Sequence, residues 1–289
     1  MSQRLRMVVL AVSVGAMSAC GDVNAALEKA SEARQLGADL VVQFTKAADA
    51  ANRAVMADTD EASVSFAKEA EQTKAAVQKD AGALGPLLQE LKYTDEEKLL
   101  TEFTGRFKEY QTLDQRILDL AVENTNLKAQ RLSFGAAQDA ADAFRDALKA
   151  VKPAGAANEY HVQALVATSV ETVREIQVLQ APHIANADEA VMTKMEKDMA
   201  TSEMNARNAL GMLRPLVEPA SRPRLATAAA ALDKFKELNT QIITLSRRNT
   251  NVRSLALSLD QKRTSIAACE ESLHALQDAL NKRGHVGSR

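Results

Sequence analysis

The chain has 289 residues, and its 36 Lys and Arg against 38 Asp and Glu give a formal net charge of −2 at pH 7. The two signs are interspersed without a basic stripe, which argues against nucleic acid as a partner. Trp is absent, only 3% of residues are aromatic, and β-branched runs and Asn-Gly hairpin signals are scarce. The composition therefore predicts an all-α protein.

The first nineteen residues are typical of a secretion signal. A basic start is followed by an apolar run of about ten residues, whereas a helix needs about twenty to cross a bilayer. Met17-Ser18-Ala19-Cys20 resembles a bacterial lipobox, which implies that Cys20 is acylated and becomes the N-terminus. Ordinary signal cleavage next to Cys20 is the alternative.

Two helical patterns follow, and two more take the same places in the second half of the chain. In the first of them, apolar residues recur at alternating steps of three and four, as on one face of an α-helix. The predicted helices cover residues 23–56, 61–91, 161–185 and 188–217.

A longer apolar seam runs through residues 94–152 and again through 221–283. Neither seam loses register at its central Asn-Thr-Asn, which begins at Asn124 in one and at Asn249 in the other. We therefore predict one helix of about sixty residues in each half, about 90 Å long. We interpret both asparagines as structural residues that fix register and bond the ends of neighbouring helices.

The two halves repeat each other. Residues 107–133 align with 232–258, so that Asn124 falls on Asn249, a shift of 125. Further upstream, residues 57–62 align with 185–190 at a shift of 128, which indicates a small indel between the blocks. The chain is thus interpreted as an internal duplication.

The predicted domains are a signal at 1–19, repeat one at 20–152 and repeat two at 153–289. Each repeat contains a helical hairpin and one long helix, which makes six helices. If the long helices lie antiparallel, one hairpin packs at each end. The predicted architecture is therefore two four-helix bundles stacked end to end and sharing both long helices.

The run Phe103-x-x-x-Phe107-x-x-Tyr110 and the stretch Ile117-x-x-Leu120, with their copies in repeat two, carry a family resemblance. The pattern resembles the helical bimodular sensor domain of bacterial chemoreceptors. That resemblance implies a small ligand, often an organic acid, bound between helices. Unlike those receptors, the sequence shows no second membrane span after Leu280 and only a short polar tail.

Polar residues on or beside the apolar seams mark a candidate ligand site in the first bundle. They are Thr73, Lys74, Arg106, Tyr110 and Lys262. An anionic ligand would gain charge-assisted hydrogen bonds there. The alternative is that the lysine and arginine stems lie on apolar surface while their charges stay in water.

The sequence does not predict an enzyme. Glu271-Ser-Leu-His274 has the Glu-x-x-His spacing of a di-iron bundle, but no second copy accompanies it. Haem, phosphate-loop and nucleophile motifs are missing, so we expect neither a metal nor a cofactor. Cys269 is in step with apolar positions, and we expect a buried thiol.

These observations favour a sensor-like lipoprotein on the periplasmic face of the cell envelope, anchored through Cys20. Gly21 after the cysteine favours the outer membrane over the inner. A small organic ligand, a receptor or envelope protein, and a second copy of the chain are the partners considered. The alternative function is an envelope scaffold or spacer without a ligand.

Overall fold

The structure is a computed structural model that describes residues 15–286, with side chains for residues 24–283. The described residues are mostly helical and include no strand, which confirms the all-α prediction. The predicted signal at 1–19 lies mostly outside the described residues, and the side chain of Cys20 is also outside them. No helix of the described part has both the length and the hydropathy that crossing a membrane requires.

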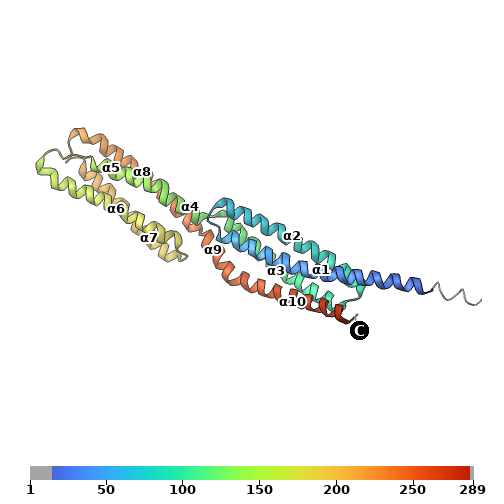
Figure 1. Cartoon of the computed structure of the whole chain (residues 1–289). Coiled ribbons are helices and arrows are strands. Elements are labelled where there is room, and N and C mark those ends of the chain that lie inside the picture. The colour runs from blue at the N-terminus through green and yellow to red at the C-terminus, as the bar shows by residue number, and fades with distance from the viewer. Residues whose placement is uncertain (1–14, 287–289) are drawn as a thin grey trace, which may run out of the picture. The chain divides into compact units, whose positions relative to one another are not determined.

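Figure 1 shows the helices in chain order. The α-helices and the two π-helical turns are α1 (Gly15–Met56), α2 (Asp60–Leu91), α3 (Thr94–Glu123), α4 (Thr125–Leu132), η1 (Ser133–Ala137), α5 (Gln138–Lys149), α6 (Glu159–Ala185), α7 (Glu189–Leu213), α8 (Arg222–Arg248), α9 (Thr250–Leu257), η4 (Ser258–Lys262) and α10 (Arg263–Val286).

The chain forms two compact units, and each contains helices from both repeats. Unit 1 contains α1, α2, α3 up to Leu118, and the chain from Leu257 onwards. Unit 2 contains Asp58–Asp60 and Asp119–Ala256. The end-to-end stacking of the two bundles stays a prediction.

The core of unit 1 is built from α1, α2, α3 and α10. Phe103, Phe107 and Tyr110 follow one another at steps of four and three, so they share one face of α3. The Phe44 ring of α1 meets all three edge-on, with centroids 6.2, 6.0 and 5.2 Å away. Gly37 of α1 lies so close to α10 that a Cβ there would sit 2.7 Å from a methyl group of Leu280.

The core of unit 2 repeats this pattern with α4, η1, α5, α6, α7 and α8. Adding 125 to the buried positions of α2 from Ala67 to Leu88 reproduces every buried position of α7 from Met192 to Leu213. α7 has 25 residues and α2 has 32. The shift of 125 is therefore constant from Ala67 and Met192 onwards, and the indel lies before these two residues, near the start of α2 and α7.

The prediction of one continuous sixty-residue helix in each half of the chain is wrong. Asn124 (φ 52°, ψ 39°) and Asn249 (φ 53°, ψ 38°) are left-handed and end α3 and α8. Asn tolerates this conformation better than most residues. The backbone N–H groups of Thr125 and Thr250 each donate to the other residue's hydroxyl, both at 3.1 Å, in place of a helical carbonyl. A π-helical turn then interrupts each segment again, at η1 and at η4.

Candidate functional site

A buried ion cluster lies between α2, α3 and η4 of unit 1. Lys74, Asp114 and Lys262 are exposed by 3%, 0% and 0%. The Lys74 ammonium lies 2.8 Å from Asp114 Oδ2, and the Lys262 ammonium lies 2.9 Å from Asp114 Oδ1. We call these three residues the lysine cluster. Two buried cations therefore share one buried carboxylate.

Local structure explains how each side chain arrives there. Asp114 lies one turn after Tyr110 on the inward face of α3. Lys262 is the last residue of η4, where the wider π-helical turn alters which positions face inward. Lys74 lies on the buried stripe of α2. Sequence reasoning missed Asp114 because the neighbouring Leu113 fits the apolar seam of residues 94–152. A carboxylate four residues after Tyr110 and three before Ile117 was the signal that could have revealed it.

The lysine cluster holds more donors than acceptors. Lys74 also pairs with the half-exposed Glu71 at 2.7 Å. Among the side chains that the structure describes, only Asp114 lies within ion-pair distance of Lys262, and that contact is too poorly directed for a hydrogen bond. The Tyr110 hydroxyl is buried beside the cluster without a well-formed hydrogen bond. The buried donors of Lys262 and Tyr110 are therefore available to an additional acceptor.

Burial changes the titration of both groups. Loss of hydration lowers the pKa of the Lys262 ammonium, and the Asp114 carboxylate only partly opposes that change. Loss of hydration also raises the pKa of the Tyr110 phenol, and the negative charge of Asp114 adds to the increase. The phenol is consequently held as a neutral hydrogen-bond donor.

The structure does not bring all five predicted site residues together. Lys74, Tyr110 and Lys262 converge, whereas Thr73 is partly exposed and donates to the Glu69 carbonyl of its own helix at 2.7 Å. Arg106 lies nearer the surface and donates to the Ala268 carbonyl at 2.6 Å. Arg106 also pairs with Glu102 and Glu271. It therefore links α3 to α10 in this structure.

The equivalent positions of unit 2 carry no charge. At the shift of 125, Lys74, Asp114 and Lys262 correspond to Met199, Asn239 and Ala137. Helices α7 and α8, the counterparts of α2 and α3, are also in contact at these positions, where the Asn239 amide lies 3.7 Å from the Met199 sulfur.

The Asn239 side-chain oxygen also takes part in a hydrogen-bond network. It accepts a hydrogen bond from Gln180 at 2.8 Å, and Gln180 in turn accepts one from Ser133 at 2.6 Å. The fold therefore accommodates a neutral network where unit 1 has the lysine cluster.

The two Asn-Thr-Asn sequences bond each other reciprocally. The Asn126 amide donates to Asn249 Oδ1, and the Asn251 amide donates to Asn124 Oδ1, both at 2.8 Å. The Asn249 amide also donates to the Asn186 carbonyl in the α6–α7 turn at 2.7 Å. Asn124 and Asn249 thus lie in a hydrogen-bonded junction within unit 2.

Sequence reasoning did not foresee a second buried polar cluster in unit 2. The His183 ring lies 2.8 Å from Ser246 Oγ through Nδ1 and 2.9 Å from Glu196 through Nε2. Arg247 donates to both Glu196 oxygens, at 2.6 and 3.0 Å. Serine, histidine and carboxylate are the residue types of a hydrolase triad. Here, however, Ser246 is fully buried and also lies 2.8 Å from the His183 carbonyl, so the cluster ties α6 to α8.

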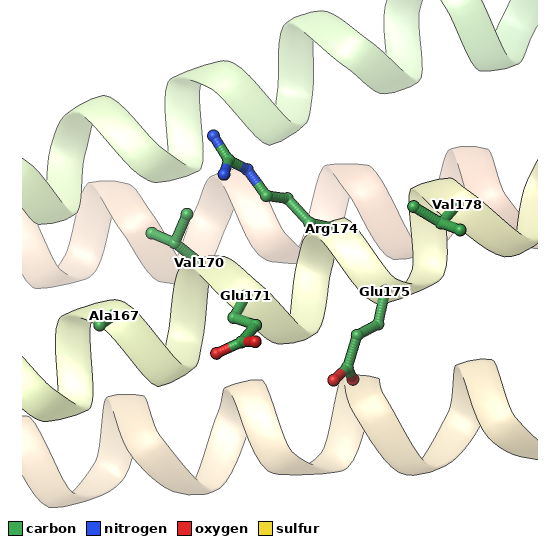
Figure 2. A pocket seen from close by; sticks show the side chains of 6 residues that line it. All are labelled: Ala167, Val170, Glu171, Arg174, Glu175 and Val178. Atoms are coloured by element: carbon green, nitrogen blue, oxygen red, sulfur yellow. The ribbon is translucent and has the colours of Figure 1, made fainter.

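A surface hollow of about 600 Å³ lies along α6. Figure 2 shows its lining, in which Arg174 points to one side of the helix and Glu175 to the other. The Glu175 carboxylate accepts a hydrogen bond from Ser202 of α7. The charged groups of this hollow do not converge on a common point.

Within the described residues, no group of three His, Cys, Asp or Glu side chains is placed to hold a metal ion. Cys269 is fully buried, and burial raises the pKa of its thiol to about 12. No protein-family model and no curated protein matches the chain.

Proposed function

We propose that the protein is a lipid-anchored binding module on the periplasmic side of the envelope, in which unit 1 takes a small carboxylate at the lysine cluster. Acylation of Cys20 provides the anchor, and the outer membrane is favoured over the inner. The resemblance to chemoreceptor sensor domains supports a sensing role, in which the bound module acts on a partner receptor.

The comparison between the two units supports this proposal most strongly. Burying an ammonium costs free energy unless it is fully paired and hydrogen-bonded. Unit 2 packs the equivalent helices with Met199, Asn239 and Ala137, so the fold itself does not require buried charges. We infer that unit 1 keeps Lys74 and Lys262 for binding.

The chemistry of the lysine cluster favours a carboxylate. A ligand oxygen would accept from the Lys262 ammonium and from the Tyr110 hydroxyl, and the second ammonium would balance its charge. Charge-assisted bonds of this kind are about twice as strong as neutral ones. The aromatic rings of Phe44, Phe103 and Phe107 beside Tyr110 favour a ligand with a small apolar part.

A thermal-shift screen of the mature, non-lipidated protein tests the proposal. Because a ligand that binds only the folded state raises the melting temperature, we expect a dose-dependent rise with at least one organic acid. Lys262→Met keeps the apolar stem and removes the charge, so it should abolish the rise. Arg106→Gln is the matched control, because it removes a cation that lies outside the lysine cluster. A rise that persists in Lys262→Met would contradict the site.

One observation favours an envelope scaffold as a second candidate function. Asp114 already provides a carboxylate inside the lysine cluster, so the ions can act as an internal tie between α2, α3 and η4. A scaffold predicts no melting-temperature rise with any organic acid. In that case, crosslinking in intact cells should capture a receptor, an envelope protein or a second copy.

A further inference from the structure

We propose that unit 2 carries a separate site for a small amphipathic anion, a carboxylate on a single apolar chain. The site is the hollow between the end of α7 and the start of α8. The inference rests on a different unit and different residues from the lysine cluster, and it does not depend on the function proposed above.

The hollow has an apolar floor. Its volume is about 390 Å³, and its lining includes Leu210 and Gly211 from α7 and Leu225 and Ala226 from α8. Leu225 belongs to the buried core of unit 2, and Leu210 packs against that core. The volume falls within the range of small-molecule sites in proteins. A short alkyl chain in this hollow would extend the hydrophobic core.

Two arginine residues line the same hollow. Arg214 follows the last turn of α7, and Arg222 begins α8. Neither side chain makes an ion pair within the described part of the protein. The nearest acid in the connecting turn, Glu218, accepts a hydrogen bond from Ser221. A guanidinium presents a planar set of donors that matches a carboxylate, so two unpaired ones beside an apolar floor fit an anion with an apolar tail.

The duplication shows that this charge is not needed for packing. At the shift of 125, Arg214 and Arg222 correspond to Gln89 and Glu97 of repeat one. Leu225 corresponds to Leu100, which is also buried. Repeat one thus keeps the core leucine but has no cation at either position. The pair of arginines is a property of repeat two, and it coincides with the hollow.

Gly211 provides a way to close the hollow without disturbing the fold. A Cβ at this position would meet no atom within 4 Å. Gly211→Leu should therefore place its side chain in the space that the apolar chain of the ligand would occupy.

The test is isothermal titration calorimetry of octanoate into the full mature chain. We expect saturable binding, weakened about tenfold by Arg214→Gln/Arg222→Gln and abolished by Gly211→Leu. Arg224→Gln is the matched control, because it removes a positive charge from the same exposed turn without lining the hollow. Lys262→Met removes the carboxylate site proposed for unit 1 and should keep the octanoate binding that depends on Gly211, Arg214 and Arg222, which distinguishes the two sites.

Acetate and octanol separate the contributions of head and tail. Each should bind at least about tenfold more weakly than octanoate, because acetate lacks the apolar chain and octanol lacks the charge. Three results would overturn the proposal. They are no saturable binding of octanoate, equal binding of octanol, and an equal loss in the Arg224→Gln control.

Discussion

Asp114→Asn should destabilise unit 1, because it leaves the lysine cluster without its shared carboxylate. Lys74 keeps Glu71 as a partner, so Lys262 becomes the uncompensated buried cation. Removing one partner of a buried ion pair typically costs about 3–5 kcal/mol. Deprotonation of Lys262 limits this cost, because neutralising a lysine of pKa 10.5 at pH 7 costs about 5 kcal/mol at 1.36 kcal/mol per pH unit. The expected loss is therefore about 3–5 kcal/mol.

The triple variant Lys74→Met/Asp114→Asn/Lys262→Met gives unit 1 a neutral set like that of unit 2. Replacing buried ions by apolar groups of similar size is often neutral or stabilising. The triple variant should therefore recover the stability that Asp114→Asn loses. In unit 2 the reverse change, Asn239→Asp, should destabilise, because Met199 and Ala137 stand at the positions equivalent to the two lysines.

Urea unfolding followed by far-UV circular dichroism measures both effects on the full chain. Because the two units can unfold in separate steps, amide hydrogen exchange should assign each change to its unit. Asp114→Asn should lower protection in α2 and α3, and Asn239→Asp should lower it in α7 and α8. A loss below about 1 kcal/mol in Asp114→Asn, or no recovery in the triple variant, would refute the reasoning.

Four further predictions concern titration, thiol reactivity and helix propensity. Burial lowers the pKa of Lys262 below 10.5, so between the folded and the unfolded pKa this lysine is protonated only in the unfolded chain. The free energy of unfolding should therefore increase as pH rises through that range, and Lys262→Met should remove the increase. Glu196 has its pKa held below 4.5, chiefly by the Arg247 hydrogen bond. Glu196 therefore contributes to the free energy of unfolding above pH 4.5, and this contribution is lost as pH falls through its pKa in the folded chain. Glu196→Gln should reduce the dependence of the free energy of unfolding on pH in the acid range. Cys269 should resist a thiol reagent in the native state and react in urea, and equal rates would contradict its burial. Gly82→Ala should raise the free energy of unfolding by about 0.5–1 kcal/mol, because Gly82 is exposed in α2 and no atom lies within 4 Å of the added Cβ.

The helices and their buried faces were predictable because periodicity reports local structure. The spacing of Phe103, Phe107 and Tyr110 is sufficient to place them on one face of α3, and the duplication carries that face over to repeat two. The break at Asn124 was not predictable in this way, since the apolar seam keeps its register through it. The left-handed residue depends on hydrogen bonds between Thr125 and Thr250, which are 125 residues apart in the chain.

The site was predictable only in part, for a similar reason. Lys74 and Lys262 stood out as charges on apolar seams, but their common partner Asp114 lies next to Leu113, which a hydrophobic pattern prefers as the buried residue. The link between His183 and Glu196, thirteen residues away across the α6–α7 hairpin, left no pattern in the sequence. Arg106 was included in the candidate site because its position on the helix does not reveal that its charge pairs with Glu102 and Glu271.

Chemical rescue of Asp114→Ala tests the account of the lysine cluster most directly. This variant removes the carboxylate and leaves space for a small anion beside Lys74 and Lys262. We predict that formate and acetate raise the melting temperature of unit 1 in Asp114→Ala above the effect of chloride at equal ionic strength. The double variant Asp114→Ala/Lys262→Met should lose that rescue. A melting temperature of Asp114→Ala that responds equally to formate and chloride would contradict an anion site at the lysine cluster.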